Sequence, residues 1–217
     1  MAERLTGLVV ATYAPFHSDG SLNLGAVEKH VTAFVALGAS GVFVNGTTGE
    51  GASLRIDERQ AIARRWCEVA RAQMPVVVHV GSTCLADCRA LAAHAQEIGA
   101  AAIACVGPGF FKPATTADLV AFCREVAAAA PGLPLYYRLI AAFERGDLET
   151  ARQEQHRATE LIVCLARHDF LPASKALMKM IGLDCGPVRL PLRPLSAEAT
   201  LKLHDELATI RFFDWRE

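Results

Sequence analysis

The chain contains 217 residues, of which 52% are hydrophobic and 21% charged, and its formal net charge is −1. This length allows one large domain or two small ones, and the balanced charge gives no electrostatic reason to expect a nucleic acid or an anionic membrane as partner. No stretch reaches the roughly 18 apolar residues of a membrane helix, and the N-terminus lacks a signal-peptide pattern. We therefore expect a cytoplasmic protein.

The first 137 residues repeat one unit, a short apolar strand followed by an amphipathic helix. In chain order, strands are predicted at Leu8–Ala11, Val42–Val44, Val76–Val80, Ile103–Val106 and Leu133–Tyr137. The helical patterns between them cover residues 24–39, 55–72, 85–100 and 117–130. Each helix has apolar residues at i, i+3, i+4 and i+7. This alternation predicts a parallel sheet with right-handed crossovers.

Residues 138–217 contain helical patterns only, at 139–168, 172–183 and 196–210. Five strands are too few for a (β/α)8 barrel, so the pattern alone favours an open, doubly wound sheet. The junction is unusual, because the strand ending at Tyr137 runs directly into the helical pattern that starts at Arg138. The residues that normally bend a chain between strand and helix are missing there.

The carboxyl ends of parallel strands are where active sites form in α/β proteins. The second predicted strand is followed by "NGTTGEG", Asn45 to Gly51, which contains two threonines and three glycines. Its backbone N–H groups and the N-terminal dipole of the next helix could bind a carboxylate or phosphate. Alternatively, the turn only caps that helix. The glycine spacing fits neither a Walker loop nor a dinucleotide fingerprint.

Two tyrosines, Tyr136 and Tyr137, end the fifth strand. A tyrosine at this position can transfer a proton to a bound substrate, or it can be a core aromatic residue with a solvated hydroxyl. The seven cysteines, an odd number with apolar flanks, predict reduced and buried thiols. Cys84 and Cys88 lie one helical turn apart, but a zinc site needs about four ligands, so we predict no metal.

These motifs resemble the pyruvate-dependent class I aldolases, the family that includes N-acetylneuraminate lyase and dihydrodipicolinate synthase. The matching stretches are "LTGLVVATYAPFHSDGSLN", "GVFVNGTTGEGASL", "VVVHVG", "AQEIGAAAIACV", "GFFKP", "AAAAPGLPLYY" and "KALMKMIGLDCGPVRLPLRPLS". The resemblance covers nearly the whole chain on both sides of the junction. "FFKP" and "RLPL" favour the lyase branch, because dihydrodipicolinate synthase typically has tyrosines where Phe110 and Phe111 stand.

The resemblance implies a (β/α)8 barrel with extra C-terminal helices, usually a homotetramer, that uses no cofactor. In this family a lysine at the end of the sixth strand forms a Schiff base with the 2-keto carbon of the substrate, and the imine accepts electrons when a carbon–carbon bond breaks. Transferred to this sequence, the resemblance implies that Thr47 and Thr48 bind the substrate carboxylate. It also implies that Tyr137 moves the proton of the C4 hydroxyl.

The resemblance also explains the junction. The family has three more strands between the tyrosine strand and a helix like residues 138–151, so about three βα units, on the order of 80 to 90 residues, are absent. We therefore predict an incomplete TIM (β/α)8 barrel with about five parallel strands in residues 1–137. Residues 138–217 would be a C-terminal helical segment of the same domain. An in-frame deletion or a mis-assembled gene is the favoured origin.

The absent segment would contain the Schiff-base lysine. Of the five lysines in the chain, only Lys112 follows the carboxyl end of a predicted strand. It has no such role in the family, and an exposed loop lysine stays protonated and is therefore a poor nucleophile. A Schiff-base lysine is thus predicted to be missing, and a small aldolase with a rebuilt site is the least favoured alternative.

The resulting hypothesis is an N-acetylneuraminate lyase-like aldolase, which reversibly cleaves N-acetylneuraminate to pyruvate and N-acetylmannosamine, in a chain that is itself inactive. The expected partners are a small 2-keto acid or sialic acid and further copies of the chain. Two alternatives remain open. One is a non-catalytic subunit or remnant of the family, and the other is a dihydrodipicolinate synthase-like aldolase with a different aldehyde partner.

Overall fold

The computed structural model describes residues 7–108, 111–137 and 160–216. These residues divide into two compact units. The first unit comprises residues 7–14 and 22–137, and the second comprises residues 15–21 and 160–216. The predicted junction between Tyr137 and Arg138 falls where the description stops, and the predicted helix at 139–168 is described only from residue 160. None of the described helices is long and apolar enough to cross a membrane.

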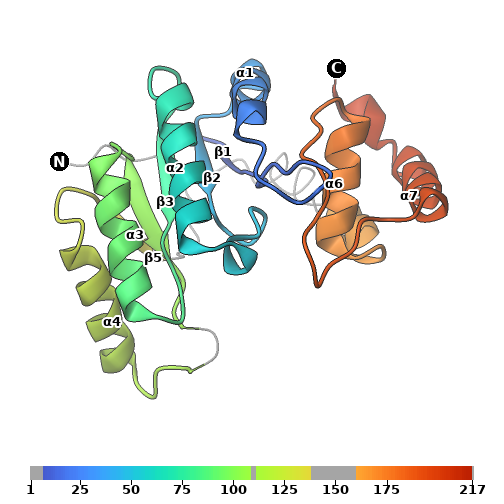
Figure 1. Cartoon of the computed structure of the whole chain (residues 1–217). Helices are drawn as coiled ribbons and strands as arrows, with labels where there is room; N and C mark the ends of the chain where they lie inside the picture. The colour runs from blue at the N-terminus through green and yellow to red at the C-terminus, as the bar shows by residue number, and fades with distance from the viewer. Residues whose placement is uncertain (1–6, 109–110, 138–159, 217) are drawn as a thin grey trace, which may run out of the picture. The chain divides into compact units, whose positions relative to one another are not determined.

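The first unit is built on a parallel sheet (Figure 1). Its five strands lie in the order β1-β2-β3-β4-β5. They span Val9–Ala11, Gly41–Val44, Val76–His79, Ala102–Cys105 and Leu135–Tyr137. A doubly wound sheet reverses its strand order at a switch point, whereas this order follows the sequence throughout, as in the wall of a barrel. The open-sheet prediction from strand counting was therefore wrong.

Four helices connect these strands: α1 (Val27–Ala36), α2 (Ile56–Ala70), α3 (Leu85–Glu97) and α4 (Thr116–Ala128). Successive helices pack side by side, α2 also contacts the strands β2 and β3 that it connects, and α3 contacts β4. Short 3₁₀ turns, η1 (Leu24–Ala26) and η2 (Gly51–Ser53), precede α1 and α2. Gly38 and Gly99 end α1 and α3 with φ of 73° and 75°, the left-handed conformation that glycine adopts at no steric cost.

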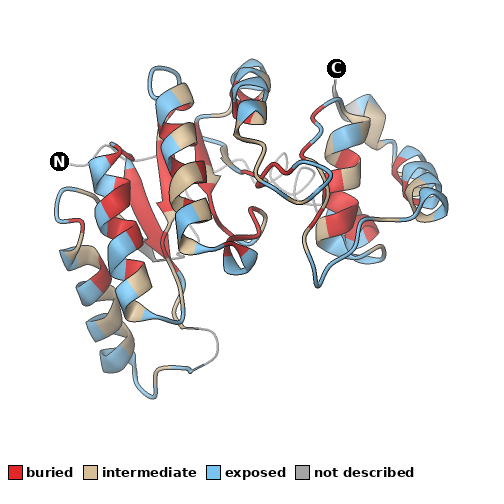
Figure 2. Ribbon diagram, viewed as in Figure 1, coloured by how far each residue is buried: buried red, intermediate tan, exposed pale blue. Residues whose placement is uncertain are grey.

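The two faces of the sheet have different neighbours. Val42, Val44, Val78 and Ile103 are 0–1% exposed and alternate with the residues of the other face. That other face carries Phe43, which packs against Val77, Ala102 and Ala104. In Figure 2 the central strands β2, β3 and β4 are largely buried, while the outer sides of α2 and α3 are exposed. The core of this unit therefore lies largely between the strands and the helices.

The second unit is helical. Residues 160–166, α6 (Phe170–Met180) and α7 (Ala197–Thr209) surround a small core, and η3 (Phe212–Arg216) follows α7. The buried residues of this core are Cys164, Leu165, Ala173, Leu177, Leu203 and Leu207.

The loop after β1 also belongs to the second unit. The ring of Phe16 is 2% exposed and contacts two cations, with its centroid 4.4 Å from Lys175 Nζ and 4.3 Å from the Arg189 guanidinium carbon. Phe16 N–H donates to the carbonyl of Cys185 at 3.2 Å. Arg189 Nη2 donates to the carbonyl of Gly20 at 2.7 Å. Seven residues from the N-terminal half of the chain, 15–21, are thereby fixed to the helical unit.

Candidate functional site

The Gly-rich turn, residues 45–51, begins immediately after β2 and folds on itself. Asn45 and Glu50 have left-handed backbones, with φ of 63° and 53°. Within the turn, Gly51 N–H donates to the carbonyl of Gly46 and Glu50 N–H donates to the carbonyl of Thr47, both at 3.0 Å. Asn45 is 1% exposed, whereas Thr47 is exposed and Thr48 is half-buried. The two threonines are therefore the part of the turn that an incoming ligand can reach.

Close backbone approach explains the glycines in this turn. A Cβ atom added to Gly51 would lie 2.0 Å from the carbonyl oxygen of Asn45, and one added to Gly49 would lie 3.1 Å from that of Thr12. A side chain at Gly51 thus cannot be accommodated without opening the turn. The compact turn therefore requires glycine at position 51 of the sequence "NGTTGEG" and leaves little room for a side chain at position 49.

The helix dipole predicted to assist this turn is displaced from it. The 3₁₀ turn η2 begins at Gly51, and α2 begins only at Ile56. Glu58 accepts a hydrogen bond from Arg55 N–H at 3.0 Å, and Asp57 also lies in the first turn of α2. Because these two carboxylates already offset the positive end of the helix, an anion at the Gly-rich turn would depend mainly on the turn's own groups.

Arg59, in the first turn of α2, is a functional candidate that the sequence interpretation missed. It is only 3% exposed. Its Nη2 donates to the carbonyl of His79 at 2.7 Å and its Nη1 donates to the carbonyl of Gly81 at 3.0 Å. The backbone carbonyl of Arg59 accepts a hydrogen bond from Asn45 Nδ2 at 2.8 Å. Arg59 therefore contacts both the Gly-rich turn and the end of β3.

His79, the last residue of β3, lies beside this arginine. Its ring centroid is 6.0 Å from that of Phe43, so both belong to the sheet face that carries Ala104. Burial, reinforced by the neighbouring Arg59 cation, lowers the pKa of the His79 imidazole from 6.5 to about 4. His79 is thus neutral near pH 7, and Arg59 supplies the positive charge at this edge of the sheet.

Tyr137 is the last residue of β5, as predicted from the sequence. The strand register pairs Ala104 with Tyr136 and Cys105 with Tyr137. The side chains of the two tyrosines and residues 109–110, which include Phe110, lie outside the described part of the chain. Phe111 and Lys112 are exposed in the loop after β4.

The lysines do not supply an evident nucleophile. Lys29, Lys179 and Lys202 lie on exposed helix surfaces, and Lys112 is exposed in its loop. Lys175 is buried in the second unit, where its Nζ donates to the carbonyl of Pro187 at 2.8 Å. None of these five residues lies in the segment where a sixth strand would follow β5.

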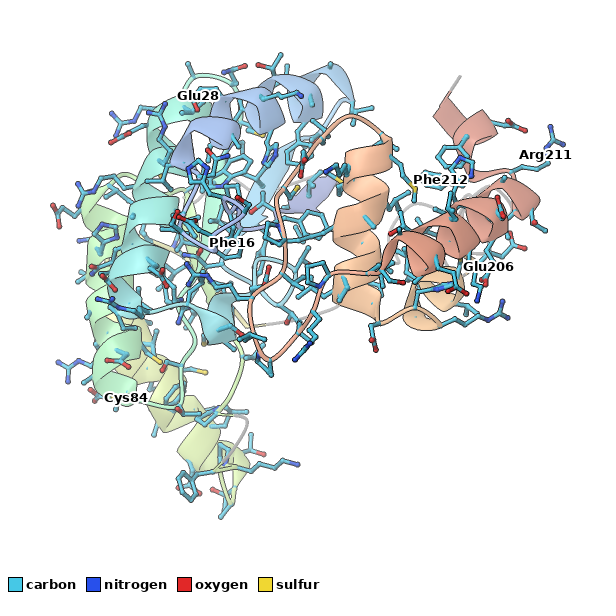
Figure 3. The ribbon with its side chains drawn as sticks, turned by 45° about the vertical axis from the view of Figure 1, so that its right-hand side comes forward. Phe16, Glu28, Cys84, Glu206, Arg211 and Phe212 are labelled. Atoms are coloured by element: carbon cyan, nitrogen blue, oxygen red, sulfur yellow. The ribbon has the colours of Figure 1, made fainter. Side chains whose placement is uncertain are left out.

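The cysteines are all free thiols, and five of them are buried. Cys84 is exposed at the start of α3 (Figure 3), whereas the thiol of Cys88 accepts a hydrogen bond from Ser82 N–H at 3.1 Å. Among the described residues, no group of three or more His, Cys, Asp or Glu side chains is arranged to hold a metal ion.

Comparison with known proteins identifies the family. The model of the dihydrodipicolinate synthetase family matches residues 4–138 and, separately, residues 135–210. The chain belongs to the dihydrodipicolinate synthetase family. The two stretches of the match to this family meet at the junction between Tyr137 and Arg138.

Relatives within the dihydrodipicolinate synthetase family include N-acetylneuraminate lyases. The chain is 47% identical to N-acetylneuraminate lyase A of Xenopus laevis over 137 residues, which are 62% of this chain and 45% of that protein. It is 44% identical to the human N-acetylneuraminate lyase over 142 residues, 64% of this chain and 44% of that protein. The chain thus spans about half the length of the curated relatives that it matches.

Solved structures agree on the fold. The N-acetylneuraminate lyase of Proteus mirabilis superimposes with a TM-score of 0.85 at 26% identity, covering 97% of this chain and all of that one. A dihydrodipicolinate synthase from Cyanidioschyzon merolae gives a TM-score of 0.84 at 18% identity, covering 96% of this chain and 99% of that one. The strand order described above is therefore that of the family's TIM-barrel fold.

Proposed function

We propose that the chain is a form of N-acetylneuraminate lyase that retains the carboxylate-binding half of the site and has lost the Schiff-base lysine. The whole enzyme would reversibly cleave N-acetylneuraminate to pyruvate and N-acetylmannosamine. The observation that supports this proposal best is the Gly-rich turn at the carboxyl end of β2, in a chain that is 47% identical to such a lyase over 137 residues.

In the proposed site, Thr47 and Thr48 bind the carboxylate of a 2-keto acid. Both lie on the accessible side of the Gly-rich turn, and the turn is held by internal backbone hydrogen bonds, so little reorganisation is needed on binding. Tyr137 is proposed to move the proton of the substrate's C4 hydroxyl, because it ends β5. Without an amine to form the imine, these groups can hold a substrate but cannot cleave it.

We further propose that both units are parts of one incomplete (β/α)8 domain. The separate matches to the family model support an internal loss, because they meet at residues 135–138. The length of the Xenopus relative, in which 137 residues are 45%, is roughly 300 residues, an ordinary length for such a barrel. The loss of about three βα units accounts for the difference in length.

Two measurements test this function. The purified chain is incubated with N-acetylneuraminate and pyruvate release is followed, and the chain is also treated with pyruvate and borohydride and analysed by mass spectrometry. We expect no pyruvate release and no covalent adduct, because borohydride fixes pyruvate to the chain only where an imine has formed, and the proposed form of the enzyme lacks the Schiff-base lysine. An adduct on Lys112, or turnover in a preparation free of full-length enzyme, would show that the nucleophile has been replaced.

A second candidate function is a non-catalytic family subunit. The second unit, with its own core, would support assembly without turnover. Size-exclusion chromatography separates the cases, since a defined oligomer without activity fits such a subunit and insoluble material fits a defective gene product. Sequencing the coding region across codons 137 and 138 then shows whether a lysine-bearing strand is encoded there.

A further inference from the structure

We propose that Arg59 is a positioning residue. It couples the Gly-rich turn after β2 to residues 79–81, called here the turn after β3, and thereby keeps Thr47 and Thr48 in place to bind a carboxylate. That the ligand is a carboxylate rests on the proposed function. The coupling between the two turns does not depend on that function. Hydrogen exchange tests the coupling, and a separate pyruvate titration tests the ligand.

The first argument is that Arg59 contacts the two turns through different groups. Its backbone carbonyl holds the side chain of Asn45, the first residue of the Gly-rich turn, at 2.8 Å. Its guanidinium holds the carbonyls of His79 and Gly81 at 2.7 and 3.0 Å. The backbone and the guanidinium of one residue thus link two strand ends that are adjacent in the sheet.

The second argument comes from burial and charge. Arg59 is 3% exposed. Among the described residues its guanidinium forms no ion pair, and Asp87 acts on it only through a longer-range charge interaction. A buried cation without a counter-ion is costly unless fixed acceptors surround it. The two carbonyls therefore fix the guanidinium, and with it the first turn of α2. A surface arginine, free to leave its partners, could not fix the distance between the two turns.

The third argument is the shape of the side chain. Arginine offers a planar fork that can reach two acceptors at once, whereas the ammonium group of lysine is a compact point charge. If position 59 served only as a positive charge, lysine would replace arginine without loss. If it sets the spacing between the turns, lysine restores this function only in part.

Amide hydrogen exchange of the ¹⁵N-labelled chain tests the coupling. The variants are Arg59→Met, Arg59→Lys and the matched control Arg55→Met, whose side chain is exposed at the start of the same helix. The probes are the amides of Glu50 and Gly51 in the Gly-rich turn and of Val80 after β3, all of which donate hydrogen bonds in the structure. The amide of Val44, within β2, reports any general loss of stability.

We expect Arg59→Met to accelerate exchange about tenfold or more at both turns relative to Val44, while Arg55→Met changes it by less than about twofold. Arg59→Lys should give an intermediate effect. The reciprocal variant Asn45→Ala, which removes the other contact, should accelerate exchange at Val80. Faster exchange confined to Val80 in Arg59→Met, or full rescue by lysine, would overturn the proposal.

A pyruvate titration, followed at the amides of Thr47 and Thr48, tests the ligand. Arg59→Met should weaken pyruvate binding about tenfold and Arg55→Met should leave it within about twofold of the unmodified chain. If pyruvate does not perturb these amides in the unmodified chain, the proposed carboxylate site is wrong. The exchange experiment still decides in that case whether Arg59 couples the two turns.

Discussion

Cys105, the last residue of β4, lies in register with Tyr137, the last residue of β5. Burial, together with the charge and hydrogen-bonding effects of the neighbouring Cys123 thiol in α4, raises the pKa of the Cys105 thiol. Cys105 is therefore on the sheet face that the helices cover. Tyr136 lies in the other row, in register with Ala104 and through it with His79.

This register leads to a prediction about the two tyrosines. Because neighbouring residues of a strand alternate between faces, only Tyr136 shares the row of His79 and Ala104. On the register we expect Tyr136→Phe to weaken pyruvate binding about threefold or more and Tyr137→Phe to leave it unchanged, in the same NMR titration. Pyruvate has no C4 hydroxyl, so an unchanged affinity in Tyr137→Phe is compatible with the proton transfer proposed for Tyr137. A stronger effect of Tyr137→Phe than of Tyr136→Phe would contradict the expectation from the register.

The stability of the chain should depend on the protonation of His79. The folded-state pKa of about 4 lies below the ordinary value of 6.5, so the unfolded state binds more protons between these values and stability falls as the pH is lowered through this window. The contribution of neutral His79 to the free energy of unfolding is fully present above about pH 6.5 and amounts to at most about 3 kcal/mol.

Urea unfolding at pH 7 and pH 4.5 measures this effect. His79→Gln should lose less stability than the unmodified chain over that range. Arg59→Met removes the positive charge that helps to lower the pKa of His79. It should therefore also lose less stability between pH 7 and pH 4.5 than the unmodified chain. An equal loss in all three proteins would mean that the imidazole is not held neutral by its surroundings.

The Gly-rich turn should not tolerate a side chain at Gly51. We expect Gly51→Ala to cost about 2 kcal/mol or more, because its methyl group would overlap the carbonyl of Asn45, and to abolish pyruvate binding. Gly25→Ala is the control, since a Cβ there would meet only Asn23 Oδ1, at 3.8 Å. Thermal unfolding and the pyruvate titration measure the two effects. A Gly51→Ala chain as stable as the control would contradict the geometry of the turn.

The contacts of Phe16 predict a large effect from a single loop residue. Phe16→Ala removes a buried ring and should reduce stability by about 3–5 kcal/mol. Phe16→Leu keeps most of the apolar contact but removes the interactions with Lys175 and Arg189, and should cost about 1–2 kcal/mol. Phe111→Ala, at a 79% exposed ring, should change stability by less than about 0.5 kcal/mol. Denaturant unfolding of the three variants tests this order.

Much of the first unit could be predicted from the sequence. Each strand lies within two residues of its predicted bounds, because short apolar runs between amphipathic helical patterns are typical of buried strands. Strand order could not be inferred from a count of strands, since five βα units fit either an open sheet or part of a barrel wall. The resemblance to the family, which rests on motifs, pointed to the barrel.

Arg59 was missed because arginine is normally a surface residue. The position itself gave a signal, since Arg59 is followed at helical spacing by Ile62, Ala63, Trp66 and Cys67, all buried on the same face of α2. A charged residue within the apolar stripe of a helix indicates a buried polar contact. The attachment of residues 15–21 to the helical unit left no comparable signal, because it depends on partners more than 150 positions away in the sequence.

That attachment determines how the polypeptide can be divided. The chain enters the helical unit at Pro15, leaves it after Ser21, and returns to it only after the whole sheet has been built. Neither unit is therefore a continuous piece of sequence. An expression fragment cut near residue 137 would leave the Phe16 ring with neither cation beside it, and a ribosome must synthesise the chain as far as Arg189 before this early loop meets all these partners.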